Sequence, residues 1–451
     1  MLVPPAVSPK NVLVIAFHFP PLAAAGTHRT LNFVRELARR GHRIGVVTTS
    51  STEGRTLDDA LSARVPDGVE VIRAGHIDPF RVLAKLKGQP STGAAKGIMP
   101  VAGQAAPSHG PTGLGAALDW TSRAVTLPDR YTSWMARAFV PALLLGRRID
   151  CDVIYSTAPP YSAHLLAYSL AGTLGRPWVA DLRDPWTLNP FHSNPYPSLE
   201  GLDRRLEEAV IGRARRVILN TEPAEALYRA RYQGVDKFTT ITNGIAPEMA
   251  NLAKLMRGAS PNGRLDLLHV GAIYGRRFPA GLMHAMAKIA IDDPTLYERL
   301  EVEQVGPGPE RAQLESMARE LGVADHLKTE GPIAHQDALE RCRNAAGLLL
   351  LGPSGDAPEI QVPSKLYEYL ALDRPIVALA REGGAIASIL ERARPRYVLA
   401  DPGDPAAIAD ALARFARGDF VSSGPADLET FGYEWLTSRL EEQLEAACEG
   451  H

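Results

Sequence analysis

The chain has 451 residues and a mass of 48.7 kDa, which is enough for two or three domains. Its 49 basic and 51 acidic residues give a net charge of −2, which argues against a generally basic nucleic-acid-binding protein. Cys151, Cys342 and Cys448 have neither the number nor the spacing of a disulfide framework or zinc site, and this favours a reducing, cytoplasmic compartment. No apolar run reaches the ~18–20 residues of a membrane span, and the stretch 11–17 is too short for a signal peptide.

The first half of the chain alternates between apolar runs and amphipathic stretches. After a proline-rich tail, apolar runs that predict buried strands lie at 11–17, 43–48, 69–73, 152–156, 177–181, 216–220 and 238–242. Amphipathic stretches that predict helices lie at about 31–40, 161–175, 200–214 and 223–232. A strand, a helix and a second strand in direct succession form a βαβ unit, which requires a parallel sheet. We therefore predict a Rossmann-like domain over residues 10–246.

One segment interrupts that domain. Residues 85–117 are rich in Gly, Ala, Pro and Ser and carry no periodic apolar face, so we predict a mobile insertion there. The prolines and glycines of residues 246–264 predict the linker to a second domain.

The second domain is predicted over residues 264–425. Its apolar runs predict strands at 265–271, 300–306, near 327, 346–351 and 375–379, with helices at 279–290, 309–321, 335–345 and 364–372. The last segment, 426–448, holds an amphipathic helix that we expect to pack back on the N-terminal domain. The predicted fold class is therefore α/β, with two Rossmann-like parallel-sheet domains facing a cleft, where open α/β sheets bind ligands.

The loop after the first strand is the first candidate for a binding site. Its small residues end at Gly26, just before a helix, so backbone N–H groups there can approach a ligand at the positive helix end. The alternative is a tight turn without a ligand. His164 follows another strand, and it fits a buried helix face at least as well as a site.

A polar cluster follows the strand at 177–181. Asp181, Arg183, Asp184 and Trp186 are costly to bury without a purpose. Carboxylates can bind sugar hydroxyls and an indole can stack on a sugar ring. The alternative, an internal Asp–Arg pair that pins the loop, is equally compatible with the spacing.

Two segments of the second domain suggest an anion site. Gly271 is followed by Arg276 and Arg277, whose planar guanidinium groups suit phosphate oxygens. Ser364 is placed to cap a helix, and Lys365 follows in its first turn, where the helix dipole disfavours a cation unless an anion is bound. In each case the alternative is a set of solvated surface charges.

Taken together, these motifs resemble a GT-B glycosyltransferase of the family-4 type over roughly residues 10–445. The resemblance rests on their order and spacing: Pro20-Pro21…Gly26, Asp181-Leu-Arg183-Asp184-Pro-Trp186, Gly271…Arg277, Pro363-Ser364-Lys365-Leu-Tyr-Glu368-Tyr-Leu-Ala and Arg374-Pro375-Ile-Val. It implies that a nucleotide sugar binds mainly to the C-terminal domain and an acceptor to the N-terminal domain. It also implies transfer with retention and no metal or other cofactor.

The resemblance assigns roles to individual residues. Gly26, Arg276, Arg277 and Lys365 would hold the donor diphosphate. The ribose and sugar would contact Glu359, Ser364 and Glu368, and the base would lie near Gly331 and Ile333. Such enzymes commonly carry two glutamates with seven residues between them; counting back from Glu368 reaches Ile360, so Glu359 is the nearest substitute. The Asp181, Arg183 and Asp184 segment takes the place of the usual histidine as catalytic group, and Trp186 and His164 would face the acceptor.

We therefore expect a cytoplasmic glycosyltransferase that moves a sugar from a nucleotide-sugar donor to a saccharide or lipid-linked saccharide, in cell-surface polysaccharide or glycolipid synthesis. Basic and apolar residues between Arg130 and Arg148 could contact the inner face of a membrane, or they could form a core helix with a cationic end. A nucleotide-sugar epimerase and a non-catalytic saccharide-binding protein share this architecture and are the alternatives. No nucleic acid is expected as a partner.

Overall fold

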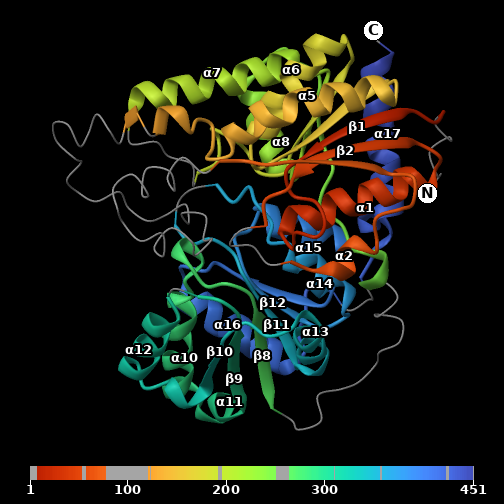
Figure 1. Cartoon of the computed structure of the whole chain (residues 1–451). Helices are drawn as coiled ribbons and strands as arrows, with labels where there is room; N and C mark the ends of the chain where they lie inside the picture. The colour runs from red at the N-terminus through yellow and green to blue at the C-terminus, as the bar shows by residue number, and fades with distance from the viewer. Residues whose placement is uncertain are drawn as a thin grey trace. The chain divides into compact units, whose positions relative to one another are not determined.

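The computed structural model describes residues 8–52, 57–77, 120–121, 123–190, 196–249, 264–308, 310–355, 358–422 and 426–449. The predicted insertion at 85–117 and most of the predicted linker lie outside the described residues. The chain divides into two compact units, shown in Figure 1. Unit 1 comprises Met1–Gly244 and Tyr433–His451, and unit 2 comprises Ile245–Gly432.

Unit 1 is built on a seven-stranded parallel sheet with the order β3-β2-β1-β4-β5-β6-β7 (Figure 1). The strands are β1 (Asn11–Ala16), β2 (Arg43–Thr49), β3 (Glu70–Ala74), β4 (Val153–Ala158), β5 (Trp178–Leu182), β6 (Arg216–Leu219) and β7 (Phe238–Thr240). The order reverses direction between β1 and β4. In such a sheet the crevice outside the carboxyl ends of the two strands at the reversal is the expected ligand site.

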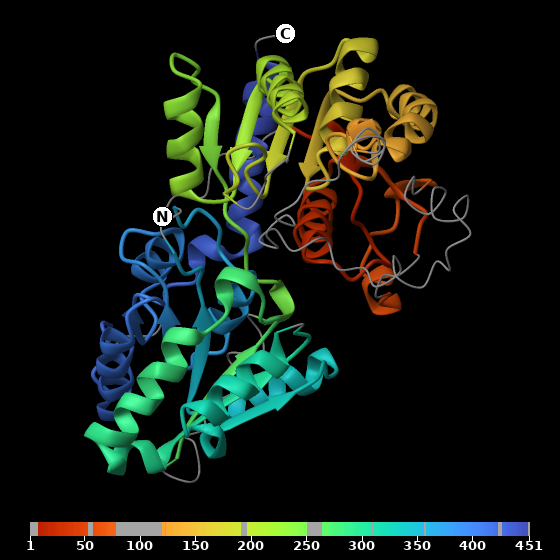
Figure 2. The ribbon, with the colours of Figure 1, turned by 90° about the vertical axis from the view of Figure 1, so that its left-hand side faces the viewer.

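Helices cover both faces of this sheet. The bounds are α1 (Ala25–Arg39), α2 (Asp59–Ser62), α5 (Thr132–Arg148), α6 (Ser162–Leu174), α7 (Pro197–Arg213), α8 (Glu222–Arg231) and α17 (Tyr433–Cys448). Because side chains alternate along a strand, Val12 and Val14 pack into the core shared with α1 and α17, whereas Leu13 lies against Gly146 of α5. Helices α5 and α6 lie side by side in Figures 1 and 2.

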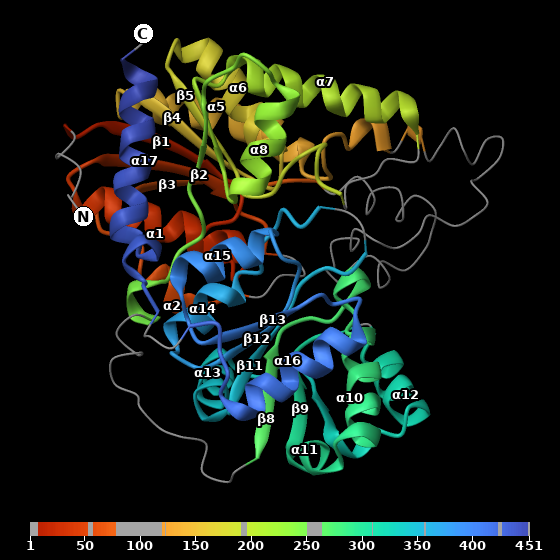
Figure 3. The same ribbon diagram turned by 180° about the vertical axis from the view of Figure 1, so that it is seen from behind.

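The C-terminal helix α17 packs back on unit 1, as expected. Tyr433, Leu436, Leu440 and Leu444 are buried in one core with residues of α1 and of the strands. Figure 3 shows α17 running beside α1 and across the sheet.

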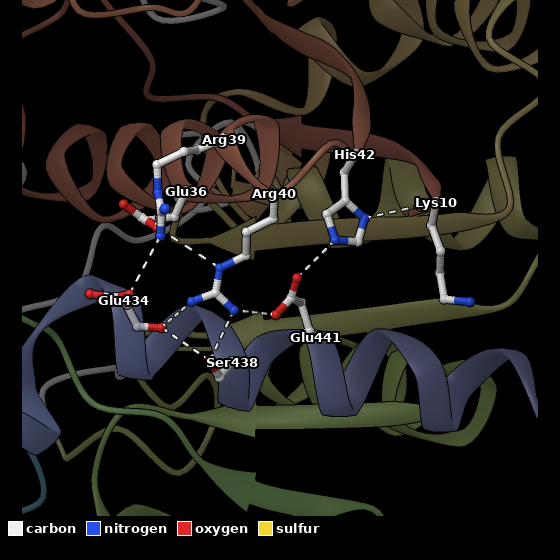
Figure 4. A network of polar contacts seen from close by, with 8 residues as sticks. All are labelled: Lys10, Glu36, Arg39, Arg40, His42, Glu434, Ser438 and Glu441. Atoms are coloured by element: carbon white, nitrogen blue, oxygen red, sulfur yellow. Dashed lines mark hydrogen bonds and ion pairs between the residues drawn. The ribbon is translucent and has the colours of Figure 1, made fainter. Parts of the chain in front are cut away.

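Polar contacts reinforce this packing, as Figure 4 shows. Arg40 forms an ion pair with Glu441 and donates to Ser438 Oγ at 2.9 Å. The backbone N–H of Lys10 donates to His42 Nδ1 at 3.1 Å, so the ring proton is on Nε2, which donates to Glu441 Oε1 at 2.9 Å. The end of α1 and the start of β2 are thereby tied to the last helix of the chain.

Unit 2 is built on a six-stranded parallel sheet with the order β10-β9-β8-β11-β12-β13. The strands are β8 (Leu265–Val270), β9 (Leu300–Val305), β10 (Leu327–Glu330), β11 (Gly347–Leu351), β12 (Ile376–Leu379) and β13 (Tyr397–Ala400). Here the order reverses between β8 and β11. The prediction of two parallel-sheet α/β units is confirmed.

Each face of this second sheet has its own core. One core joins alternate strand residues such as Leu348 and Leu350 to the helices α13 (His335–Asn344), α14 (Lys365–Ala371) and α15 (Ala385–Ala393). The other joins Leu349 and Leu351 to α10 (Ala280–Asp292), α11 (Pro294–Arg299), α12 (Arg311–Glu320) and α16 (Pro405–Arg417). Figure 3 shows α16 and α10 side by side.

The structure differs from the sequence prediction in two respects. Strand β13 and the helices α2, α11, α15 and α16 were not predicted; of these, β13, α15 and α16 complete the C-terminal half of unit 2. The polar cluster that begins with Asp181 was expected at and beyond the end of its strand, but Asp181 is the fourth residue of β5, which continues to Leu182.

Candidate functional site

In unit 2, glycines follow four adjacent strands at their carboxyl ends: Gly271 after β8, Gly306 after β9, Gly331 after β10 and Gly352 after β11. Two of them are dictated by close backbone packing. A Cβ on Gly306, whose φ is +147°, would lie 2.5 Å from the carbonyl oxygen of Gly271, and one on Gly352 would lie 2.7 Å from that of Leu379. At this edge the backbone of Gly306 therefore packs against that of Gly271, and the backbone of Gly352 against that of Leu379, more closely than a Cβ would allow.

The two arginines after β8 have different surroundings. Arg276 donates from Nε to the carbonyl oxygen of Ser354 at 2.7 Å, and the Ser354 N–H donates back to the Arg276 carbonyl at 2.7 Å. Arg276 therefore fastens the loop after β11. Arg277 makes a longer contact, 3.4 Å, from Nη1 to the hydroxyl of Tyr274, and it is half-buried. Of the pair, Arg277 is better placed to meet an anion.

Helix α14 carries three of the predicted donor residues. Ser364 lies at the N-cap position, but its side chain makes no capping bond, because its φ and ψ of −57° and −26° are already helical. Ser364 therefore occupies the predicted N-cap position, but its side chain does not cap the helix. Lys365 Nζ lies 3.0 Å from Glu368 Oε2, and each side chain is a little over one quarter exposed. This intrahelical pair balances the cation in the first turn.

Glu359, the substitute for the first family glutamate, is buried and accepts hydrogen bonds from backbone groups within unit 2. Its Oε1 accepts from the N–H of Ile386 at 2.9 Å and its Oε2 from that of Arg381 at 3.3 Å. Burial raises the pKa of this carboxyl despite those bonds. Glu359 thus binds the N-terminal turn of α15, and these contacts assign it a structural role.

The two residues expected near the base follow β10. Gly331 and Ile333 are partly buried, and Ile333 packs against the core formed with α13, α14 and α15. They share the carboxyl edge of the sheet with Gly271 and Gly306.

Sequence reasoning missed two buried polar residues at this edge. His269 is the fifth residue of β8 and Gln304 the fifth of β9, and the two are register partners in the sheet. In β8 the available signal was a histidine between Leu268 and Val270, whereas Gln304 follows Glu301 and Glu303 in β9 and no local signal distinguished it.

In unit 1, Asp181 is held in a buried ion pair. Arg29 of α1 donates from Nε to Asp181 Oδ2 at 2.9 Å and from Nη2 to Oδ1 at 3.0 Å, with the side chains 2% and 0% exposed. Tyr155 also donates to Oδ2 at 2.6 Å. Burial opposes ionisation, but the charge and hydrogen bonds of Arg29 outweigh it and hold the pKa of Asp181 below its ordinary value. The predicted contact of Asp181 with substrate is not met here, because the carboxylate is enclosed.

Arg183 and Gly26 are brought together. A Cβ on Gly26 would lie 1.7 Å from Arg183 Nη1, so only glycine fits under the guanidinium. Arg183 donates from Nε to the carbonyl oxygen of Ala158 at 3.2 Å and also binds that of Pro159. The first turn of α1 contains no acidic residue. A cation therefore lies against the positive end of a helix at the carboxyl edge of the sheet.

Asp184 is partly buried just beyond β5, and its carbonyl lies 3.5 Å from the hydroxyl of Tyr161. Of the two predicted catalytic carboxylates, Asp184 is the more accessible.

Trp186 and His164 are both fully buried. Trp186 donates from Nε1 to Asp203 Oδ1 at 2.9 Å, and its ring stacks on Tyr161 with centroids 4.7 Å apart. His164 Nδ1 lies 2.8 Å from Ser156 Oγ, and burial lowers its pKa to about 3. Because protein encloses both rings, neither is open to the predicted sugar contact. His164 lies on the buried face of α6, which was the alternative to a site role.

Two features are absent from the described part of the chain. No helix in it is long and apolar enough to cross a membrane. Within the same residues, no group of three or more His, Cys, Asp or Glu side chains is arranged to hold a metal ion.

Both units match known families. Residues 25–244 match the glycosyl transferase 4-like domain, and residues 264–417 match the glycosyl transferases group 1 family. A D-inositol 3-phosphate glycosyltransferase of Thermomonospora curvata is 30% identical over 310 residues, which cover 60% of this chain and 68% of that protein. The chain belongs to the GT-B glycosyltransferases of the family-4-like type.

A further relative and a solved structure are consistent with this family assignment. A D-inositol 3-phosphate glycosyltransferase of Geodermatophilus obscurus is 28% identical over 62% of this chain, and the match spans 66% of that protein's length. The structure of HepE from Anabaena, solved in complex with UDP and glucose, has a TM-score of 0.59 at 14% identity. That likeness covers 97% of this chain and all of HepE, and it shows the GT-B fold. The two family matches and the 30% identical relative, not the structural likeness, place the chain among the glycosyltransferases.

Proposed function

We propose that this glycosyltransferase takes a sugar from a nucleotide-sugar donor held on unit 2 and transfers it with retention to a saccharide or lipid-linked saccharide. The observation that carries the donor assignment is the carboxyl edge of the unit 2 sheet. The partly exposed backbone at Gly271 lies beside His269, and the charges of Arg277 and Lys365 are close enough to act on that imidazole. Such a combination stabilises the charge of a departing nucleoside diphosphate.

The ion pair between Lys365 and Glu368 fits this proposal. On binding, Lys365 would exchange its contact with Glu368 for a phosphate oxygen, which leaves the carboxylate to accept from ribose hydroxyls. The donor nucleotide we propose is UDP. HepE, which shares the fold, was solved with UDP and with UDP-glucose.

On unit 1, the guanidinium of Arg183 and the first turn of α1 suit an acceptor that carries an anionic group. Such an acceptor is a second candidate, because relatives at 28% and 30% identity act on an inositol phosphate according to their names. A lipid-linked saccharide and a phosphorylated polyol both present a phosphate to this surface.

We further propose a cytoplasmic enzyme that acts at the inner face of a membrane, through helix α5. Val140 and Leu144 of α5 are 57% and 58% exposed, and Arg137, Arg147 and Arg148 are exposed beside them. This is the pattern of a helix that binds an anionic lipid surface. Sedimentation with phosphatidylglycerol vesicles tests it, with Val140→Ser/Leu144→Ser as the variant expected to stay in the supernatant.

The test of the activity is a matrix of donors and acceptors. UDP-, GDP-, ADP- and dTDP-sugars are incubated with the enzyme alone, with oligosaccharides, with lipid-linked saccharides and with inositol phosphates, and products are followed by mass spectrometry. Release of nucleoside diphosphate together with a new glycoside supports transfer. Conversion of the donor sugar without any acceptor would instead identify the epimerase alternative, and donor binding without turnover would identify a binding protein.

A further inference from the structure

The hydrogen-bond ladder between β8 and β11 changes character at His269. Backbone pairing joins Leu267 to Gly347 and Leu268 to Leu348. At the next position His269 Nδ1 lies 3.0 Å from the carbonyl oxygen of Leu349. A carbonyl can only accept, so Nδ1 carries the proton and Nε2 carries a lone pair. The imidazole thus supplies the next hydrogen bond between β8 and β11, the two strands between which the sheet order reverses.

The lone pair on Nε2 has no hydrogen-bond partner among the described residues, although His269 is only 8% exposed. Its register partner Gln304 is 2% exposed and also has a buried acceptor atom without a donor among the described residues. The Gln304 amide nitrogen donates to the Gly271 carbonyl at 2.9 Å, and its Oε1 has no donor within the described chain. Unsatisfied buried acceptors are uncommon, and here two neighbours both lack a donor.

Gly271 leaves space beside this pair. A Cβ built on Gly271 would have three ring atoms of His269 as its nearest neighbours, with Nε2 at 3.0 Å. Any other residue would therefore direct its side chain at the unpaired nitrogen.

The charge state of the imidazole limits what it can bind. Burial, together with the nearby charges of Arg277 and Lys365, lowers the pKa of His269 to about 4. The ring is neutral near pH 7 and acts at Nε2 only as an acceptor. A phosphate oxygen has no proton to give it, whereas a sugar hydroxyl does.

We propose that His269 Nε2, with Gln304 beside it, accepts a hydrogen bond from a hydroxyl group of the bound nucleotide sugar. His269 is then a positioning residue of the donor site, and this inference rests on the donor assignment proposed above. The cations would hold the diphosphate while His269 fixes the rotation of a neighbouring sugar ring. That ring is the ribose or the transferred sugar, which share this chemistry.

The test is calorimetry of wild type and His269→Asn with UDP-glucose, UDP and inorganic pyrophosphate. An asparagine amide can still donate to the Leu349 carbonyl, but nothing replaces Nε2. We expect about tenfold weaker binding of UDP-glucose, as for one lost hydrogen bond that leaves a polar group unpaired. Pyrophosphate affinity should stay unchanged. Equal weakening of UDP assigns the contact to the ribose, and unchanged UDP assigns it to the transferred sugar.

Unchanged affinity of folded His269→Asn for both UDP and UDP-glucose would overturn the inference. If wild type binds neither ligand, the proposed donor site itself fails. Should His269→Asn not fold, Gly271→Ala carries the same test, because it keeps the imidazole and places a methyl group 3.0 Å from Nε2. Because Gly271 also belongs to the proposed diphosphate edge, pyrophosphate is titrated beside the nucleotides. A loss of nucleotide affinity that exceeds the loss for pyrophosphate supports the hydroxyl contact, and an equal loss for all three ligands overturns it.

Discussion

Arg29 and Asp181 are 152 residues apart in sequence and form an ion pair with two hydrogen bonds in the core of unit 1. The same guanidinium donates from Nη1 to the carbonyl of Thr242 at 2.6 Å and from Nη2 to that of Ile241 at 2.9 Å. One side chain of α1 therefore holds β5 and the segment that follows β7. Because Gly26 lies one turn before Arg29, the pair also fixes the helix start against which Arg183 lies.

Asp181→Asn should destabilise unit 1 strongly. The substitution leaves Arg29 buried without its counter-charge, a change that typically costs about 3–5 kcal/mol. Urea denaturation followed by circular dichroism measures the loss. A stability within about 1 kcal/mol of wild type would show that Asp181 is not the clamp described above.

Asp184→Asn should reduce the transfer rate and leave the stability of unit 1 unchanged. Asp184 lies beyond β5 and is only partly buried, so we expect the fold and nucleotide binding to persist while the transfer rate falls at least about tenfold, the effect of one lost charged contact with the reacting groups. Initial rates and calorimetry on the same preparation separate the two effects. If the variant transfers normally once its folded fraction is counted, Asp184 has no catalytic role.

Lys365→Ala and Arg277→Ala should each weaken nucleoside-diphosphate binding about tenfold to a hundredfold, since a charge-assisted hydrogen bond contributes about 1.5–3 kcal/mol. Isothermal calorimetry with UDP measures this. Lys288→Ala is the matched control, because Lys288 pairs with Asp292 on the exposed side of α10. Affinities equal to wild type in both test variants would remove the diphosphate site.

Catalysis should need no divalent metal. We expect Arg277 and Lys365 to neutralise the diphosphate, which is the task a metal ion performs in other transferases. Transfer rates in EDTA should match those in buffer alone. Activity that is abolished by EDTA and restored by Mg²⁺ or Mn²⁺ would contradict this expectation.

Glu441 makes the docking of α17 dependent on pH. Burial alone would raise the pKa of this carboxyl, but the hydrogen bond with His42 and the charge of Arg40 outweigh it and lower the pKa below 4.5. A lowered folded-state pKa stabilises the protein above the unfolded-state value, and this stabilisation is lost as pH falls through the folded-state value. Wild type should therefore exceed Glu441→Gln in stability above pH 4.5, and the difference should shrink below it.

Chemical denaturation of both proteins over a pH series measures that difference. Glu442→Gln is the control on the same helix, since Glu442 pairs with Arg439 and both side chains are more than one third exposed. A gap between wild type and Glu441→Gln that stays constant as pH falls below 4.5 would show that the pair with His42 and Arg40 is not what stabilises the helix.

Local sequence patterns predicted most of the two sheets, because central strands such as β1 and β11 are apolar runs, as burial on both faces requires. They missed β13, although its four residues are as apolar as the four of β12, which was predicted. Helix α16 could have been found: Asp404 caps it by accepting from the N–H groups of Ala406 and Ala407, and Gly418 ends it with φ +72°.

The candidate site was harder to predict, because its contacts join distant parts of the chain. The sequence around Asp181 shows Arg183 two residues away, yet the partner is Arg29, on a helix near the other end of the unit. Likewise, nothing local reveals that Glu359 binds the start of α15 or that Tyr161 stacks on Trp186. Residue type and spacing indicated a polar edge on each sheet, whereas burial and pairing decide which of its members face solvent.

The place of α17 in the chain has a consequence for the order of folding. Unit 2 is one continuous stretch, whereas the core of unit 1 requires Tyr433, Leu436, Leu440 and Leu444, which are synthesised after all of unit 2. During translation the second unit can therefore complete its core while the first still exposes the apolar groove that α17 will fill. The unit that begins first on the ribosome is the one that finishes last, and a chaperone that shields apolar surface would meet this groove in every nascent chain.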